Sequence, residues 1–301
     1  MMTYREKREL FADRIYPATI TPFTEDNKVN RRAMKQLMER NCREGARGLF
    51  IGGSSAECFL LSHEERIALF ETAAEMKGKA TLIAHVGAFA TQEAIEYARA
   101  AKELGFDAVS ATPPFYYGFN SAAINRYYYD IYEAVGLPIF IYNFPGNTGK
   151  EFDLADPCYR ELFCSEAIIG VKHTNQVVYQ LERIKNLNPE LIMLNGYDET
   201  MIAALSLGAD GAVGSTFNFM YPHFDKIWHA FKAGDLEQAR TLQIKANNIM
   251  NVCVNVGLFP AIKYILGQQG IDAGLPRKPF LPLSEAQKKQ VDAVLAENLE
   301  G

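Results

Sequence analysis

The sequence predicts an α/β protein built as a (β/α)8 TIM barrel with a C-terminal helical extension. Three observations support this prediction. Short β-like runs alternate with helical patterns eight times between Tyr16 and Gly234 of the 301-residue chain. Glycines stand where five of the helical patterns stop. No GxGxxG turn follows the first strand, which argues against a doubly wound sheet, the alternative arrangement for alternating strands and helices.

The eight predicted strands are short, as buried parallel strands of a barrel are. They cover residues 16–21, 48–51, 81–86, 108–112, 139–143, 168–172, 191–195 and 211–215. The helical patterns that follow them cover residues 31–44, 62–77, 91–104, 121–135, 153–163, 176–186, 200–207 and 221–232. Each strand is therefore joined to a helix by a short link, which is the repeat unit of this barrel.

The ends of the predicted helices carry capping signals. Ser62 followed by Glu65 predicts a capping box, because each side chain can satisfy a backbone donor of the other residue. Glycines occupy positions suited to a left-handed C-terminal cap at residues 45, 78, 105, 136 and 208. Beyond Gly234 the pattern is helical throughout, with predicted helices over 235–256, 260–269 and 284–299. We expect a barrel over residues 1–234 and a helical appendage over 235–301 that packs on it as one structural unit.

Composition excludes several classes of protein. With 48% hydrophobic and 22% charged residues, the chain has ample material for a globular core. The net charge of −5 argues against nucleic acid or an anionic membrane as the main partner. No apolar run reaches the roughly 18–20 residues of a membrane span, and the charged start is unlike a secretory signal. The five cysteines are scattered without CxxC pairs, which predicts reduced thiols in a cytoplasmic protein.

Lys172 is the most informative residue. It directly follows the apolar residues 168–171 of the segment IIGVKHTN, which are predicted to form a buried strand. Its amine is therefore expected to be buried as well. Burial disfavours the charged form of lysine, and lowering its pKa from about 10.4 to near 7 takes roughly 4–5 kcal/mol. The neutral amine is a nucleophile that condenses with ketones and aldehydes to a Schiff base. The alternative is a strand-end lysine whose amine extends to solvent.

Polar residues also follow the other predicted strands at the same end of the barrel, where chemistry is expected. They supply hydroxyls, phenols, an amine and carboxylates with few basic groups: Thr21, Ser54, Ser55, His85, Tyr116, Tyr117, Tyr142, Lys172, Thr174, Asp198, Glu199, Ser215 and Thr216. This set suits an amine nucleophile, a phenolic proton carrier and partners for a polyhydroxylated substrate. If Lys172 points inward, alternation places Thr174 on the same side and His173 towards the helices. The five histidines lack paired metal spacing, so we expect no metal site.

Seven motifs in order carry a family resemblance: GGSSAE (52–57), TPPFYY (112–117), YNFPGNTG (142–149), GVKHTN (170–175), NGYDE (195–199), GSTFN (214–218) and RKPF (277–280). From about Pro17 to Pro282 the sequence resembles the N-acetylneuraminate lyase branch of the dihydrodipicolinate synthase-like class I aldolases. The YN-P-TG and GVK motifs are typical of the superfamily. NGYDE and GSTFN point to the sialic acid branch.

The resemblance implies a role for each matching residue. Lys172 matches the lysine that forms the Schiff base, and Tyr142 matches the tyrosine that moves protons during carbon–carbon cleavage. Ser54 and Ser55 match a Ser-Thr pair that holds the substrate carboxylate. Tyr117 matches a tyrosine that reaches into the site of a neighbouring subunit. The positions that contact the sugar are matched by Thr174, Gly196, Asp198, Glu199 and Ser215.

The implied activity is the reversible cleavage of N-acetylneuraminate to pyruvate and N-acetylmannosamine, without metal or other cofactor, in a homo-oligomer that is a tetramer or a dimer. Serine replaces threonine at Ser55, and Ala56 replaces a glycine, which would restrict the backbone there. Gly146 and Asn147 stand where lyases usually carry an apolar pair. Dihydrodipicolinate synthases carry an arginine at the position of Asn147, so that activity is disfavoured while the preferred sugar or acid stays open.

Two alternatives accompany this interpretation. One is another pyruvate-dependent 2-oxo-acid aldolase, acting on a 2-keto-3-deoxy sugar acid or as a 4-hydroxy-tetrahydrodipicolinate synthase that uses aspartate semialdehyde. The other is a non-catalytic barrel that binds sialic acid or pyruvate as a sensor, which the presence of both Lys172 and Tyr142 disfavours. Asp198 and Glu199 also suit the start of the following helix, so we expect them to cap it as well as to bind substrate.

Overall fold

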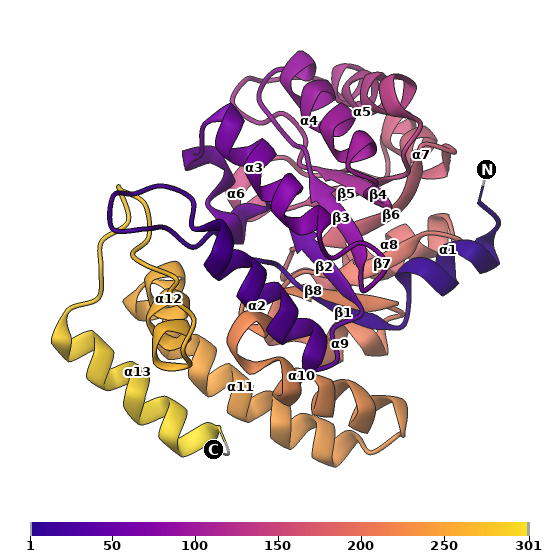
Figure 1. The fold of residues 1–301 in the computed structure, drawn as a ribbon. Helices are drawn as coiled ribbons and strands as arrows, with labels where there is room; N and C mark the ends of the chain where they lie inside the picture. Colours follow the sequence, from indigo (N-terminus) through magenta and orange to yellow (C-terminus); the bar gives the residue numbers. More distant parts are fainter. Residues whose placement is uncertain (1, 300–301) are drawn as a thin grey trace.

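The computed structural model of the protein describes residues 2–299, and its centre is a ring of eight parallel strands (Figure 1). Their order in the sheet is β1-β8-β7-β6-β5-β4-β3-β2. A bridge that pairs Ala18 with Phe50 joins the first strand to the second and closes the ring. The strands are β1 (Arg14–Pro17), β2 (Gly48–Ile51), β3 (Thr81–His85), β4 (Ala108–Ala111), β5 (Ile139–Asn143), β6 (Ile168–His173), β7 (Ile192–Asn195) and β8 (Gly211–Gly214). The predicted (β/α)8 barrel is confirmed.

One main helix follows each strand and covers the outside of the ring (Figure 1). These helices are α2 (Arg31–Arg43), α3 (His63–Ala74), α4 (Thr91–Glu103), α5 (Ser121–Val135), α7 (Pro157–Cys164), α8 (Val178–Leu187), α9 (Met201–Ser206) and α10 (Phe217–Lys232). Short helices occupy the links after three strands: η1 (Ser54–Ala56), η2 (Cys58–Leu60), α6 (Pro145–Thr148) and η3 (Asp198–Thr200). The capping box of Ser62 and Glu65 is present at the start of α3, and all five predicted cap glycines have positive φ.

The N-terminal segment differs from the prediction. The first strand is β1 at Arg14–Pro17, and of the predicted strand residues beyond it only Ala18 makes a β-bridge. Helix α1 (Tyr4–Phe11) has no counterpart among the predicted helices, although Thr3 and Glu6 form a capping box at its start. Phe11 ends this helix inside the barrel, where its ring centroid lies 5.3 Å from that of Phe140. Helix α1 therefore closes the end of the barrel at which the strands begin.

Three helices follow α10: α11 (Leu236–Val256), α12 (Leu258–Gln268) and α13 (Glu285–Asn298). Helices α11 and α12 lie against α10, and α13 packs on α11 and α12, coloured orange to yellow in Figure 1. Ile249, Ile262 and Val291 of these helices belong to one apolar cluster with Ile15 and Leu37 of the barrel. The boundary at residue 234 stays a prediction, but this shared cluster brings the C-terminal helices to the wall of the site described below.

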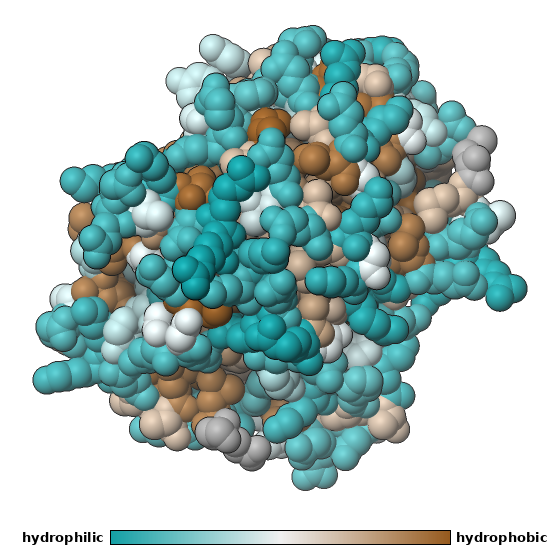
Figure 2. Space-filling model, in the orientation of Figure 1, coloured by the Kyte–Doolittle hydropathy of each residue, from teal (hydrophilic) through white to brown (hydrophobic). Residues whose placement is uncertain are grey.

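The surface in the view of Figure 2 is mainly hydrophilic, with separate apolar patches between hydrophilic residues. Within residues 2–299, no single helix is long and apolar enough to cross a membrane. Helices α11 and α12 taken together meet that test of length and composition, with a bend of 116° between them.

Candidate active site

The direction of the Lys172 side chain depends on an irregularity in β6. The pairing of β6 with β5 shifts by one residue at Ile169. Ile169 lies in the apolar cluster inside the barrel, whereas Val171 belongs to the cluster between strands and helices. An extra residue of this kind reverses the alternation of inward and outward side chains. Lys172 therefore points into the barrel, directly beside Tyr142 of β5.

Lys172 is held in a nearly closed apolar setting. The residue is 3% exposed, and its Nζ lies 4.1 Å from the ring centroid of Phe50 and 4.0 Å from that of Tyr142. Burial lowers the pKa of the Lys172 amine to about 7, against the opposing effect of the nearby Asp198 and Cys58. A large fraction of the amine is consequently neutral and nucleophilic at neutral pH.

Tyr142 places its phenol beside this amine and beside the turn after β2. Its hydroxyl lies 3.4 Å from that of Ser54, and its ring stacks on Phe144 with centroids 5.7 Å apart. Burial raises the pKa of the Tyr142 phenol, so the phenol is protonated at neutral pH. The residue can therefore begin a reaction as a proton donor.

The link after β2 presents two hydroxyls to the same space. Ser54 and Ser55 lie in η1, and the Ser55 hydroxyl is 2.5 Å from that of Ser215 in the link after β8. The left-handed conformation directly after η1 falls on Glu57, with φ of 57°, and the predicted restriction of the backbone at Ala56 stays a prediction. Ala56 is a buried member of the short helix.

Two acidic residues follow β7. The Asp198 carboxylate accepts hydrogen bonds from the backbone N–H (2.9 Å) and the hydroxyl (2.5 Å) of Thr216. Burial and the neighbouring Glu199 raise the pKa of Asp198 to about 7, and burial raises that of Glu199 as well. As predicted, both residues lie in the first turn of the following helix, η3, but neither acts as its N-cap, because the N-cap residue is Tyr197 and neither η3 nor α9 has a side-chain cap. The Asp198 side chain instead ties the link after β7 to the link after β8.

The side chain of Thr174 packs closely against the backbone of Gly196. A Cβ at position 196 would lie 1.9 Å from Oγ1 of Thr174, so only glycine permits this approach. Thr174 is buried on the same side as Lys172, as the alternation predicts. His173 lies on the other side, as also predicted, with its Nε2 at 3.2 Å from the carbonyl oxygen of Val177.

A cavity of about 400 Å³ collects these groups at the ends of the strands. Nine of the ten predicted site residues line it: Ser54, Ser55, Tyr142, Lys172, Thr174, Gly196, Asp198, Glu199 and Ser215. Part of its wall is apolar and comes from the C-terminal helices through Met250, Val254, Leu258 and Phe259. These four were not predicted, and no strand-end signal could have found them, because they lie on helices far along the chain.

Tyr117, the tenth predicted residue, lies elsewhere. It is 65% exposed in the link after β4, and its ring contacts those of Tyr116 and Phe119 with centroids 5.0 and 6.0 Å away. It does not line the cavity of its own chain. A role in the site of a neighbouring subunit stays a prediction.

Comparison with known proteins decides the family. A family model described as the dihydrodipicolinate synthetase family matches residues 12–298. The chain belongs to this family. A curated N-acetylneuraminate lyase of Rhizobium meliloti (strain 1021) is 41% identical over 273 residues, which is 90% of each protein.

Solved structures of family members agree with this assignment. N-acetylneuraminate lyase of Fusobacterium nucleatum has 34% identity and a TM-score of 0.90, with 96% of this chain and 100% of that chain covered. CdNal of Clostridium difficile, in complex with mannosamine, has 34% identity and a TM-score of 0.90, with 95% and 99% covered. The protein is a class I aldolase, an enzyme of the lyase class, and class I chemistry uses a lysine Schiff base and needs no metal ion. Among residues 2–299, no group of three His, Cys, Asp or Glu side chains is arranged to hold a metal.

Proposed function

We propose that this aldolase reversibly cleaves N-acetylneuraminate to pyruvate and N-acetylmannosamine, without a cofactor. The observation that carries the proposal is the buried Lys172 amine, with a pKa lowered to about 7, beside the Tyr142 phenol in a cavity rich in hydroxyls and carboxylates. A neutral amine in that position can attack the 2-keto group of the open-chain sugar acid.

In this proposal the Schiff base forms at Lys172 with Tyr142 as the proton donor. Attack of the amine on the ketone gives a carbinolamine, and the Tyr142 phenol protonates its hydroxyl, which leaves as water. The product is a protonated imine beside a phenolate. The positive charge of the imine offsets the cost of holding that phenolate in a buried site.

Cleavage follows from the electron demand of the imine. The phenolate of Tyr142 takes the proton of the 4-hydroxyl group, the bond between carbons 3 and 4 breaks, and its electron pair moves into the imine to give an enamine. The sugar leaves as an aldehyde, N-acetylmannosamine. Protonation of the enamine and hydrolysis of the resulting imine then release pyruvate and restore the Lys172 amine.

Binding is assigned to the remaining polar groups of the cavity. Ser54 and Ser55 would hold the carboxylate of the keto acid, close to Tyr142. Asp198, Glu199 and Ser215 would accept or donate hydrogen bonds to the sugar hydroxyls, with Thr174 and Gly196 between the two groups. Carboxylates suit a neutral polyol because each of their oxygens accepts hydrogen bonds.

The proposal is tested by a product assay combined with trapping. Incubation with N-acetylneuraminate is expected to release pyruvate and N-acetylmannosamine, with activity retained in EDTA. Borohydride with pyruvate is expected to add a reduced pyruvyl group to Lys172 alone, located by peptide mass spectrometry, and a Lys172→Ala variant serves as the control. Faster turnover of a 2-keto-3-deoxy sugar acid, or of pyruvate with aspartate semialdehyde, would assign the alternative aldolase activity. Reversible binding without an adduct would assign a sensor.

We also infer a cytoplasmic homo-oligomer, a tetramer or a dimer, whose substrates are small molecules. The exposed aromatic residues around Tyr117 support an association between copies of the chain, because they form a surface of contacting rings (Tyr116, Tyr117 and Phe119). Sedimentation velocity of the wild type and of Tyr117→Ala tests this inference.

A further inference from the structure

A second buried lysine lies outside the proposed chemistry. Lys263 of α12 is 3% exposed, and its Nζ is 2.7 Å from Oε1 of Glu57, which is also buried. The same amine donates a hydrogen bond to the carbonyl oxygen of Leu275 (3.1 Å) and lies 4.1 Å from the ring centroid of Phe23. Unlike Lys172, this lysine is paired and does not line the 400 Å³ cavity.

Glu57 stands at a critical place in the backbone. It directly follows η1, which carries Ser54 and Ser55, and it precedes η2. Its φ of 57° is left-handed, a conformation that a residue with a long side chain adopts only when its surroundings hold it. The pair with Lys263 supplies such a hold, because it fixes the carboxylate of the one residue at which the chain turns between the two short helices.

The C-terminal segment holds the same turn from a second side. The backbone N–H of Arg277 donates a hydrogen bond to Oε2 of Glu57 at 2.7 Å. The Arg277 guanidinium binds both carboxylate oxygens of Glu65 (2.5 and 2.7 Å) and the carbonyl oxygen of Leu60 (2.9 Å). The segment from Glu57 to the start of α3 is thus fastened to residues that lie more than 200 positions later in the chain.

We propose that the Glu57–Lys263 pair, supported by Arg277, is a positioning device that sets the Ser54–Ser55 turn for binding the substrate carboxylate. This inference rests on the proposed function, which assigns that carboxylate to the two serines. The two residues act through the turn and do not touch substrate. Because the two charges cancel, the pair acts by fixing geometry and contributes little net field at Lys172.

The test compares two probes that differ only at the carboxylate. Lys172 is trapped with cyanoborohydride and either pyruvate or methyl pyruvate, and the half-saturating concentration of each is measured by mass spectrometry of the adduct. Two variants are used, Glu57→Gln and the double variant Glu57→Gln/Lys263→Met. The double variant guards against failure to fold, because replacing both members of a buried pair is tolerated better than removing one.

We expect the half-saturating concentration of pyruvate to rise about tenfold in both variants, equivalent to about 1.4 kcal/mol, while that of methyl pyruvate changes less than about twofold. Ser55→Ala, which alters the turn itself, is expected to show the same selective loss. Lys185→Met removes one member of an ion pair with Asp210 at the opposite end of the barrel. It is expected to leave the half-saturating concentrations of both probes unchanged.

An equal loss for both probes, or unchanged pyruvate binding in folded variants, would overturn the positioning role, as would failure of both variants to fold. These outcomes differ from failure of the proposed function, in which the wild type itself would form no adduct with pyruvate.

Discussion

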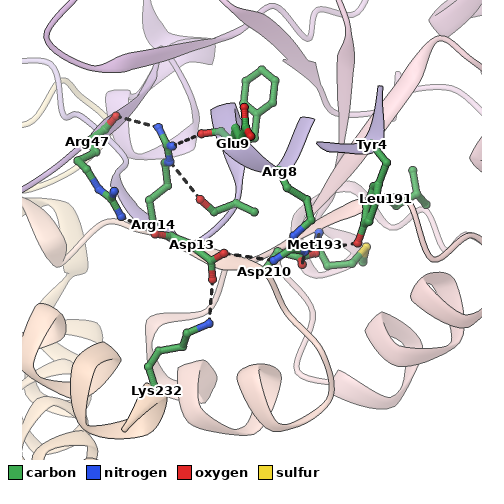
Figure 3. Close-up of polar contacts among 12 residues, drawn as sticks. Tyr4, Arg8, Glu9, Asp13, Arg14, Arg47, Leu191, Met193, Asp210 and Lys232 are labelled. Carbon is green, nitrogen blue, oxygen red and sulfur yellow. Dashed lines mark hydrogen bonds and ion pairs between the residues drawn. The ribbon is translucent and has the colours of Figure 1, made fainter. Parts of the chain in front are cut away.

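The buried charged groups that line the cavity differ from those at the opposite end of the barrel in how they are paired. Where the strands begin, Asp210 pairs with Arg8 and lies beside Met193, whose backbone N–H donates a hydrogen bond to it at 2.9 Å (Figure 3). Asp210 also pairs with Lys185 at 2.8 Å. Where the strands end, the nitrogen of Lys172 makes no ion pair with any of residues 2–299, and the carboxyl of Asp198 is bound by hydroxyl and amide donors alone.

The difference shows which end contributes stability and which end contributes chemistry. Removing one partner of a buried ion pair is strongly destabilising, because it leaves the other charge buried and uncompensated. The groups around Asp210 therefore hold the fold together. An unpaired buried amine costs folding free energy, because burial shifts its pKa by several units at about 1.4 kcal/mol each. The cavity is the place where the proposed reaction needs a neutral amine, and the fold tolerates that cost there.

The largest expected effect comes from replacing Lys172, in the cavity, or Lys185, at the opposite end of the barrel, with methionine. Lys172→Met should reduce cleavage by about 10⁴-fold or more, because the cavity then has no nucleophile. It should also raise stability, since burial lowers the pKa of Lys172 from 10.5 to about 7. The unfolded chain therefore binds the extra proton between pH 7 and 10.5, so wild-type stability rises with pH over that window and the gain from Lys172→Met is larger at pH 7 than at pH 10.

Lys185→Met is the matched control for that variant. It should keep activity within about twofold and lower the free energy of unfolding by about 1–3 kcal/mol, because Asp210 loses one partner. The measurements are kcat/KM and urea unfolding at both pH values. If Lys172→Met and Lys185→Met lowered the free energy of unfolding equally, the unpaired and the paired lysine would not differ in their contribution to stability.

The next effect concerns two buried tyrosines. Tyr142→Phe should lower kcat by about 10²–10⁴-fold, the usual contribution of a positioned acid–base group. Tyr16→Phe, near the other end, removes a hydrogen bond from its hydroxyl to the carbonyl oxygen of Phe11 (2.8 Å) and should cost about 1 kcal/mol of stability with kcat unchanged. Steady-state kinetics with N-acetylneuraminate separate kcat from KM. A change in KM alone for Tyr142→Phe would make the phenol a binding group only.

A smaller effect is expected from the two buried aspartates. Asp198→Ala should lower kcat/KM for N-acetylneuraminate by roughly 5- to 150-fold, since each lost hydrogen bond leaves a buried partner unsatisfied at about 1–3 kcal/mol. Pyruvate trapping at Lys172 should not slow, because the proposed position of the keto acid is towards Ser54. Asp210→Ala should leave kcat/KM within about twofold and destabilise the protein by roughly 3 kcal/mol. If Asp198→Ala left kcat/KM for cleavage unchanged, the sugar would have to bind to other residues.

The smallest effect is the pH dependence of trapping in the wild type. With the Lys172 pKa near 7, the neutral fraction of its amine rises about tenfold between pH 6 and pH 8. The initial rate of adduct formation with pyruvate at saturating reductant should rise by that factor and then level off. A rate that still rises steeply at pH 9 would mean that the amine keeps the pKa of an exposed lysine.

Most of the fold and of the candidate site could be predicted because they depend on local signals. The Ser62–Glu65 box and the left-handed cap at Gly136 each involve residues within one helical turn, so neighbouring positions are sufficient to specify them. Strands that end at one edge of a barrel bring their following residues together whatever the details of packing. For this reason nine of the ten site residues meet in one cavity.

The sequence by itself therefore determined the repeat of strands and helices, the family motifs and the set of chemical groups at the mouth. Only the tertiary structure decided the directions of those side chains and their protonation states. The inward direction of Lys172 requires the shift at Ile169, which exists only in the pairing of two strands, and its lowered pKa requires the rings of Phe50 and Tyr142 around it. The Glu57–Lys263 pair and the apolar wall from α11 and α12 likewise join distant segments. Such features result from burial and long-range contacts, which no local pattern of residues records.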